Sequence, residues 1–480
     1  MSESKKSLSR REFLKWSSVV SAGAALAACA PVPAGDTGGD TAASSSDGAM
    51  VERMATDEEV AQWLTGKVPA DQAGDFKIMS WEDEGEIRKF LLHINQFFDT
   101  FYPGMEPEIE WGIPWGEYWT KLPTLMAAGT PPDMAWQHQS RGEVFPSKGW
   151  STDLTDYINT WAPDGWPDDW WEQSVDTMSY NGVVYAIPYD WATHGLYINR
   201  DIMDSILDYP AQSDWTWQDF REAAIAATTE TDDGKQFGVK LSTAASFLNL
   251  ITQSNGGELF AEDLSESFFG SDTAVDAAQF VYDLRWTDGV MATPEEENAM
   301  GMTGNLGFVS GRIAMNRSLN DEAFRLDEAI GDGFPWGVYS IPAGTDAHLS
   351  FAGNSGWFIP TGSRYPDMAY ELIRFGLSNP ELLPTTGVMG SMIVARKSFW
   401  EWGLPQGELA ERIPNYKEVF VDIPAKDPRT FPNWPGSAEW QNLYRKHMDP
   451  VFLEGNPDVA GAMAALQEET NEFLASENGG

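Results

Sequence analysis

Short apolar runs alternate with stretches of helical periodicity along the chain. Phe76–Trp81 and Pro107–Trp111 are typical of strands, and Ile87–Phe101 between them carries apolar residues every three to four positions, as on one face of a helix. A third apolar run, Asp133–Trp136, follows another segment of helical spacing. This βαβαβ order predicts a parallel sheet covered by helices.

The same alternation continues toward the C-terminus. Thr216 precedes Asp219 in the spacing of a helix cap, ahead of a small apolar helix face. Further strands are predicted at Gly195–Asn199, Phe237–Leu241, Arg312–Asn316 and Trp336–Ile341, and further helices at 271–286, 368–376 and 459–473. Because a chain of 480 residues is too long for a single core, we predict an α/β fold with two doubly wound lobes.

The N-terminal segment does not share this pattern. A mildly apolar run, Trp16–Ala28, follows basic residues and is about half as long as a bilayer-spanning helix, which is typical of an export signal. Residues 30–74 begin small and polar and indicate a flexible tether, in which Thr56–Glu59 has the spacing of a capping box for a short helix. The signal therefore covers 1–29, and the folded body begins near Asp75.

The signal resembles a twin-arginine export signal, because Arg10 and Arg11 stand in the order Ser-Arg-Arg-x-Phe-Leu-Lys. Leu26-Ala-Ala-Cys29, at the end of the apolar run, is similar to the lipobox of bacterial lipoproteins. This resemblance implies lipidation of Cys29 and a protein exported and anchored by lipid at the outer face of the cell membrane, periplasmic or extracellular. The alternative is an ordinary buried cysteine in a helix.

Composition removes several classes of function. Asp and Glu number 73 against 31 Lys and Arg, a formal charge of −42, so the surface repels phosphate backbones and no nucleic-acid partner is expected. A single cysteine excludes intramolecular disulfides. The chain has no P-loop and no Gly-x-Gly-x-x-Gly motif, and its five histidines are scattered without metal-ligand spacing. We therefore expect no cofactor and no metal.

Several segments, in one order along the chain, resemble motifs of a known family. They are Tyr-Trp-Thr-Lys-Leu at 118–122 with Ala-Gly-Thr-Pro-Pro-Asp at 128–133, Asn-Gly-Val-Val-Tyr-Ala-Ile-Pro at 181–188, Leu-Tyr-Ile-Asn-Arg-Asp at 196–201, Thr-Trp-Gln-Asp-Phe at 216–220 and Phe-Val-Ser-Gly-Arg-Ile-Ala-Met at 308–315. Behind a lipoprotein-like signal, this order resembles the extracellular solute-binding proteins of ABC importers, the branch that mostly carries sugars. Ala-Gly-Asn-Ser-Gly-Trp at 352–357 is similar to a further family motif, in which Asn354 replaces the usual Gly, and Asn181 replaces the usual Asp of the motif at 181–188.

The resemblance implies a periplasmic-binding-protein-like fold, with two lobes joined by crossing hinge strands. On this chain it implies a first lobe of 75–192 plus 314–352 and a second lobe of 193–313 plus 353–480. A carbohydrate would bind in the cleft between the lobes, at the carboxyl ends of strands. The implied partners are the ABC transporter's membrane permease subunits, and the implied state is a monomer that is not an enzyme.

A sugar needs flat aromatic faces for its C–H groups and polar side chains for its hydroxyls. Residues of these types that follow predicted strands or helices, or lie in a late loop, are Trp81, Glu82, Trp136, Asp190, Trp191, Asn255, Gly256, Asn316, Arg317, Asn354, Trp357 and Trp434, and these are the predicted ligand-binding residues. Other interpretations stay open: most tryptophans in any fold are core residues, Gly256 is equally suited to end a helix, and Glu82 belongs to an acidic run.

Two alternatives to a sugar-binding protein remain. A receptor of the same fold for polyamines or basic peptides would use acidic residues and aromatic cages to hold cations. A secreted glycoside hydrolase also uses aromatic residues, with a pair of carboxylates whose separation a sequence cannot give.

Overall fold

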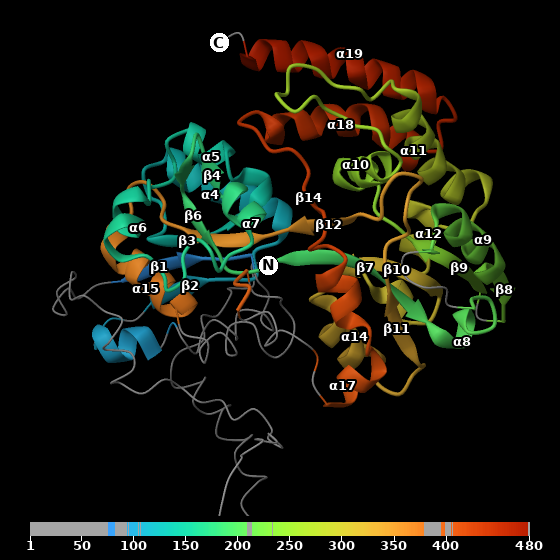
Figure 1. Ribbon diagram of the computed structural model, residues 1–480, viewed down its shortest axis with the longest axis horizontal. Coiled ribbons are helices and arrows are strands. Elements are labelled where there is room, and N and C mark those ends of the chain that lie inside the picture. The colour runs from blue at the N-terminus through green and yellow to red at the C-terminus, as the bar shows by residue number, and fades with distance from the viewer. Residues whose placement is uncertain are drawn as a thin grey trace, which may run out of the picture. The chain divides into compact units, whose positions relative to one another are not determined.

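The computed structural model of the chain is shown in Figure 1. The residues that the structure describes are 75–81, 94, 96–103, 105, 107–208, 214–232, 234–378, 395–398, 405 and 407–478. Within them the predicted strands and helices are present, with ends shifted by a few residues. The predicted α/β class is therefore confirmed.

The first sheet has five strands in the order β2-β1-β3-β13-β6. They are β1 (Phe76–Met79), β2 (Pro107–Glu110), β3 (Met134–His138), β6 (Ala186–Pro188) and β13 (Ser355–Phe358). β1 is parallel to β2 and β3, as the βαβαβ pattern predicts, whereas β13 runs antiparallel to β3 and β6.

The second sheet has seven strands and is centred on β7 and β10. Its strands are β7 (Ala192–Asn199), β8 (Thr229–Thr231), β9 (Gly234–Lys240), β10 (Ile313–Leu319), β11 (Trp336–Tyr339), β12 (Ser350–Gly353) and β14 (Pro428–Arg429). β10 pairs antiparallel with β7 and parallel with β9. β12 pairs antiparallel with β7, so it lies next to the strand by which the chain enters this sheet.

Helices cover both faces of each sheet (Figure 1). Those of the first lobe are α4 (Trp115–Ala127), α5 (Val144–Ser147), α6 (Thr155–Trp161), α7 (Glu172–Asp176) and α15 (Pro366–Ser378). Those of the second are α8 (Arg200–Met203), α9 (Trp217–Ala227), α10 (Ala245–Ser254), α11 (Asp272–Tyr282), α12 (Pro294–Ala299), α13 (Leu306–Val309), α14 (Glu322–Ile330), α17 (Gly407–Arg412), α18 (Ser437–Phe452) and α19 (Val459–Asn478).

The second sheet separates two apolar cores. One contains side chains of α9, α10, α11, α18 and α19, and the other contains side chains of α14 and α17. The first lobe has its own core around β1, β3, α4 and α15. This arrangement of sheets between helices is the doubly wound fold that the sequence predicts.

A tight hairpin explains one departure from the family motif. Asn181 and Gly182 connect β4 (Ser179–Tyr180) to β5 (Val183–Val184), with φ angles of 51° and 77°. Two successive positive φ angles belong to a type I′ turn, for which Asn-Gly is the favoured pair. Asn at 181 is therefore suited to this turn.

The chain crosses between the sheets at two short connections. The first joins β6 to β7 through Asp190, and the second joins β12 to β13 through Asn354. The two connections are bonded together, because the backbone N–H of Ser355 donates to Oδ1 of Asp190. Asn354 is held on the first lobe, where its Oδ1 accepts from the Thr177 hydroxyl at 2.7 Å and its carbonyl accepts from the Gln139 N–H at 3.1 Å.

The sheet pairing divides the chain differently from the prediction, although both sheets belong to one compact unit, residues 52–480. Residues 314–352 were expected in the first lobe, but β10, β11 and β12 all pair in the second sheet. Residues 353–480 were expected in the second lobe, but β13 and α15 pack in the first. The physical reason is that β10 returns antiparallel beside β7, so the chain leaves the second sheet only after β12.

Candidate functional site

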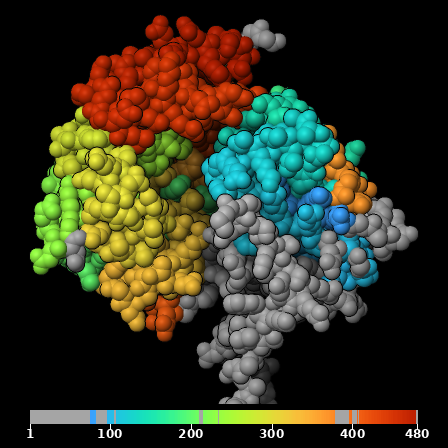
Figure 2. Space-filling model, turned by 180° about the vertical axis from the view of Figure 1, so that it is seen from behind, coloured from blue at the N-terminus to red at the C-terminus, as the bar shows by residue number. Residues whose placement is uncertain are grey.

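A pocket of about 130 Å³ lies where the first lobe meets the second. Its lining comes from His138–Arg141 in the first lobe and from Ala244–Ser246, Phe351, Phe431–Asn433, Ser437 and Gln441 in the second. Figure 2 shows a recess between the surface coloured cyan and the surface coloured yellow and orange. Typical small-molecule pockets measure about 300–1,000 Å³, so this conformation leaves less room than a sugar requires.

His138 ends β3 and is one of the residues that line the pocket. Its Nδ1 accepts from the backbone N–H of Ser140 at 3.2 Å and lies 2.8 Å from that residue's hydroxyl oxygen. Burial, reinforced by the positive charge of Arg141, lowers the pKa of His138 to about 3. The ring is therefore neutral at ordinary pH, and with Nδ1 accepting, its proton is on Nε2. Nε2–H is a fixed hydrogen-bond donor.

A group of aromatic rings borders His138, and we call it the tryptophan group: Trp81, Trp115 and Trp119. Trp81 follows β1, and the other two lie one turn apart on α4. The Trp115 ring is 5.0 Å from the His138 ring and 5.2 Å from each of the other two tryptophans, centroid to centroid. Trp115 is 48% exposed. The group therefore offers an open indole beside the pocket, the kind of surface that stacks on a sugar ring.

Arg141 stands over the tryptophan group on the pocket's first-lobe side. Its guanidinium carbon is 5.4 Å from the Trp119 ring centroid, and Nη1 donates to the carbonyl of Ser140 at 2.8 Å. Burial lowers its pKa, while the carboxylate of Glu439 on α18 acts in the opposite direction. Glu439 is itself paired with Lys148, N to O 3.2 Å, across the two lobes.

The second-lobe wall of the pocket is the start of α10 together with Phe351 of β12. The residue before α10, Ala244, gives the helix no side-chain cap. The first N–H groups of an uncapped helix carry partial positive charge. Among its described lining residues the pocket contains no Asp or Glu, so its electrostatic character differs from that of the acidic chain as a whole.

Arg317 lies behind this wall. Its guanidinium carbon is 4.6 Å from the ring centroid of Phe247 on α10. Nε is buried without a hydrogen-bond partner among the described residues, and burial lowers the pKa of Arg317 to about 9. His194, whose ring is 5.3 Å from that of Phe351, has its pKa lowered well below the ordinary value by burial and by the charge of Arg317.

Of the predicted ligand-binding residues, the structure brings Trp81 and Arg317 to the surroundings of the pocket. Asp190 and Asn354 lie at the crossings between the sheets, where they hold the connections together. Asn316 is buried, and its side chain donates to Oδ1 of Asn305 at 2.9 Å. These polar groups are engaged within the protein.

Asn255 and Gly256 end α10 at the opposite end from the pocket. The Asn255 side chain donates to the Ile251 carbonyl at 2.8 Å and accepts from the Thr345 N–H at 3.1 Å. Gly256 has φ of 78°. This geometry matches the helix-ending alternative for Gly256.

The structure does not bring four predicted tryptophans to the pocket. Trp136, Trp191, Trp357 and Trp434 are each at most 4% exposed. Their rings pack on other aromatic rings: Trp136 on Trp357, Trp191 on Trp171, and Trp434 on Trp440. In this conformation they are core residues.

Sequence reasoning missed Trp115, Arg141 and Phe351. One signal was available for Trp115, because Trp115 and Trp119 are four residues apart, a spacing that places both on one helix face. No comparable pattern marks Arg141 or Phe351, which reach the pocket through the packing of one lobe on the other. Glu82, Cys29, Arg10 and Arg11 lie outside the described residues.

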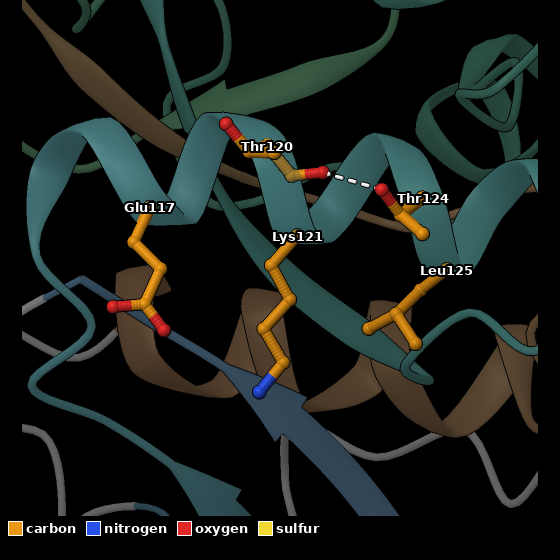
Figure 3. A pocket seen from close by; sticks show the side chains of 5 residues that line it. All are labelled: Glu117, Thr120, Lys121, Thr124 and Leu125. Atoms are coloured by element: carbon orange, nitrogen blue, oxygen red, sulfur yellow. Dashed lines mark hydrogen bonds between the residues drawn. The ribbon is translucent and has the colours of Figure 1, made fainter.

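A second hollow is an open groove along one helix, α4 (Figure 3). It is lined by Glu117, Thr120, Lys121, Thr124 and Leu125. Lys121 is paired with Glu110, and the Thr124 hydroxyl donates to the backbone carbonyl of Thr120 at 2.7 Å. With its cation paired and no aromatic ring in its lining, this groove lacks the groups that hold a sugar.

The described residues offer neither a membrane-spanning helix nor a metal-binding cluster. None of their helices is long and apolar enough to cross a membrane. They contain no group of three or more His, Cys, Asp or Glu side chains placed to hold a metal ion.

Two α/β lobes, joined by short crossings around a pocket that both line, define a two-lobed binding protein. Residues 92–381, more than half of the chain, match the bacterial extracellular solute-binding protein family, and the chain belongs to that family. Residues 7–27 match the signal sequence of the twin-arginine translocation pathway, which indicates export. The predicted family and signal are confirmed, and the family is one of solute-binding proteins rather than enzymes.

Individual relatives are distant. A lactose-binding protein from Rhizobium radiobacter is 22% identical over 317 residues, which cover 62% of this chain and 69% of the relative. An ABC substrate-binding protein from Listeria monocytogenes in complex with cycloalternan is 20% identical, with a TM-score of 0.69 over 85% of this chain and 100% of the other. A solute-binding protein from Thermotoga lettingae bound to α-D-tagatose is 18% identical, with a TM-score of 0.70 over 84% and 100% of the two chains. These structures confirm the periplasmic-binding-protein-like fold.

Proposed function

We propose that this protein captures a carbohydrate between its two lobes and delivers it to the membrane permease of an ABC importer. The observation that carries the proposal is the half-exposed indole of Trp115 beside the fixed donor of His138, at a pocket that both lobes line. An aromatic face next to hydrogen-bond donors is what a sugar ring requires. The relatives named above are described as binding lactose, cycloalternan and tagatose.

Capture requires the lobes to move. The pocket of about 130 Å³ is too small for a disaccharide, so the ligand enters when the lobes are apart and is enclosed when they approach. A ligand that contacts both lobes binds the closed state more tightly and shifts the equilibrium toward it. The crossings at Asp190 and Asn354 are the proposed hinges, and the closed form is the one that docks on the permease.

The lining supports a sugar over the two alternatives. A polyamine or basic peptide would need carboxylates, and a glycoside hydrolase would need two of them at the bond it cleaves. The described lining has neither Asp nor Glu. Trp119 stands instead under Arg141, so a cation already occupies one aromatic face.

Thermal unfolding of the soluble chain from Asp75 onward, against a panel of mono- and oligosaccharides, tests the proposal. A sugar at 100 times its Kd stabilises by about 2.7 kcal/mol. Spermidine and a basic peptide serve as comparison ligands, and a chromogenic glycoside tests for turnover. Stabilisation by spermidine but by no sugar, or hydrolysis of the glycoside, would refute the carbohydrate assignment.

We further propose that Cys29 carries a lipid that holds the mature protein, as a monomer, at the outer face of the membrane. Lipid at a single cysteine after the signal gives an anchored protein. The test is metabolic labelling with a radioactive fatty acid. Wild type should be labelled and sediment with membranes, Cys29→Ser should be unlabelled, and equal labelling of the two would disprove the anchor.

A further inference from the structure

The charge around the pocket is opposite to the charge of the chain. The sequence has 73 acidic residues against 31 basic ones, yet the described lining holds Arg141 and His138 and no carboxylate. The wall opposite Arg141 begins an uncapped helix, α10, and Arg317 lies behind it. Acidic residues outnumber basic ones more than twofold in this protein, so a pocket lining without Asp or Glu calls for an explanation.

Arg317, which is partly buried, differs from the buried arginines Arg285 and Arg396. Arg285 donates to the carbonyls of Ala292 and Phe452 at 3.0 and 2.7 Å. Arg396 donates to the carboxylate of Asp169 at 2.8 Å. The Arg317 side chain has no such hydrogen bond or ion pair among the described residues, and its described contact is the face of Phe247.

The Arg317 side chain is only partly buried, but its Nε–H is buried without a hydrogen-bond partner among the described residues. A buried donor of a charged group is costly to leave unbonded, so proteins generally bond such donors to carbonyls or carboxylates. The lowered pKa of Arg317 has burial as its cause, with no nearby carboxylate acting against it. The same side chain also depresses the pKa of His194. Its guanidinium is therefore available to an anion that comes from outside the chain.

The first lobe presents a matching group. Arg141 has a side-chain hydrogen bond only to the neighbouring carbonyl of Ser140, among the described residues, and its plane rests on Trp119. His138 adds a neutral Nε2–H donor beside it. Guanidinium groups bind carboxylates and sulfates through two parallel N–H···O bonds, so both arginines suit one kind of ligand group.

We infer that the ligand is an acidic carbohydrate, a sugar bearing a carboxylate or a sulfate ester, whose anionic group is held between Arg141 of the first lobe and Arg317 of the second. The inference rests on the proposed function and narrows it to a substrate class. An anion that contacts cations on both lobes is bound best when the lobes are closed, so the charge also drives closure. A neutral sugar would leave both cations unpaired.

Isothermal titration of the mature protein with matched sugar pairs tests this. Each pair consists of a neutral disaccharide of galactose, glucose or mannose and the same disaccharide with a uronic acid in place of one sugar. A sulfated disaccharide is titrated separately, to distinguish a sulfate ligand from a carboxylate ligand. We expect one acidic member to bind at least about tenfold more tightly than its neutral partner. That preference should shrink on going from 50 to 300 mM NaCl, because salt screens the ligand charge.

Arg317→Gln and Arg141→Gln should each abolish most of this preference, measured as the ratio of the Kd values of the neutral and the acidic member of a pair. The matched control is Arg325→Gln, which removes the same charge from a partly exposed arginine on α14 that is paired with Glu322 at 3.4 Å. The control should retain the preference. Thermal unfolding of each variant checks that it folds, and if Arg317→Gln does not fold, the wild-type comparison and Arg141→Gln still decide.

The results distinguish failure of the acidic-ligand inference from failure of the carbohydrate-binding function. Neutral sugars that bind as tightly as acidic ones would overturn the inference and leave the carbohydrate-binding function standing. A panel in which neither member of any pair binds would overturn both. Equal loss of preference in Arg325→Gln would mean that overall charge, rather than the pocket, selects the anion, and would also overturn the inference.

Discussion

Replacing Trp115 by alanine should weaken sugar binding about tenfold and leave the fold intact. An indole buries roughly 150–250 Å² when enclosed, and Trp115 is 48% exposed, so about 100 Å² is open to a ligand. A sugar ring that covers half of this area gains about 1.3 kcal/mol at 25 cal/mol per Å². That free energy corresponds to nearly tenfold in Kd.

Isothermal titration with the sugar that stabilises the wild type measures the loss, and thermal unfolding measures the stability. Trp357→Ala is the contrasting variant, because Trp357 is 1% exposed and stacks on Tyr189 at 5.0 Å. Truncating it should cost about 3–5 kcal/mol of stability. If Trp115→Ala folds normally and binds with unchanged Kd, the tryptophan group is not the sugar platform. Trp115→Phe should recover part of the affinity.

Three further predictions concern stability and closure. Burial raises the pKa of Glu143 to about 7, so the folded state binds this proton more tightly than the unfolded state does. The protein should therefore lose stability as pH rises from about 4.5 to 7. Glu143→Gln should lack that loss, and its urea midpoint should fall less between pH 5 and pH 8 than that of the wild type. Asp133 accepts from the backbone N–H groups of Lys77 and Arg364 at 2.8 and 2.9 Å, so Asp133→Ala should cost about 3 kcal/mol in urea unfolding, and a cost below about 1 kcal/mol would contradict this role. Lys148→Ala removes the pair with Glu439 across the lobes and should weaken ligand binding by about two- to fivefold, with recovery when the two charges are exchanged.

The fold was predictable because its signals are local. The periodic runs and the cap at Thr216 each depend on residues a few positions apart. In the structure Thr216 accepts from the Asp219 N–H at 3.2 Å, and the Asp219 side chain in turn accepts from the Thr216 N–H. The division of strands between lobes was not predictable in this way. Which sheet contains β10 depends on its pairing with β7, more than a hundred residues earlier in the chain.

The placement of one predicted site residue depended on a strand end that was predicted two residues early. β3 was expected to end at Trp136, which would have put that indole at the mouth of the cleft. The strand continues to His138, so Trp136 lies inside the sheet opposite Trp357 and His138 takes the strand-end position. The rule that ligands gather at strand ends was therefore applied to Trp136 instead of His138, because the apolar run ends at Trp136 and does not show that the strand continues through the polar residues Gln137 and His138.

The unpaired state of Arg317 connects the energetics of the fold with the choice of ligand. The unbonded Nε–H of the partly buried Arg317 side chain lowers the stability of the empty protein, because no described residue accepts its hydrogen bond. On the proposed assignment a ligand anion accepts that bond, so the cost to stability is offset when the anionic ligand binds. A carboxylate built into the wall would stabilise the empty protein but would occupy Arg317 and repel the acidic sugar. On the proposed assignment, the absence of acids from this one pocket of an acidic protein is therefore the basis of its selectivity.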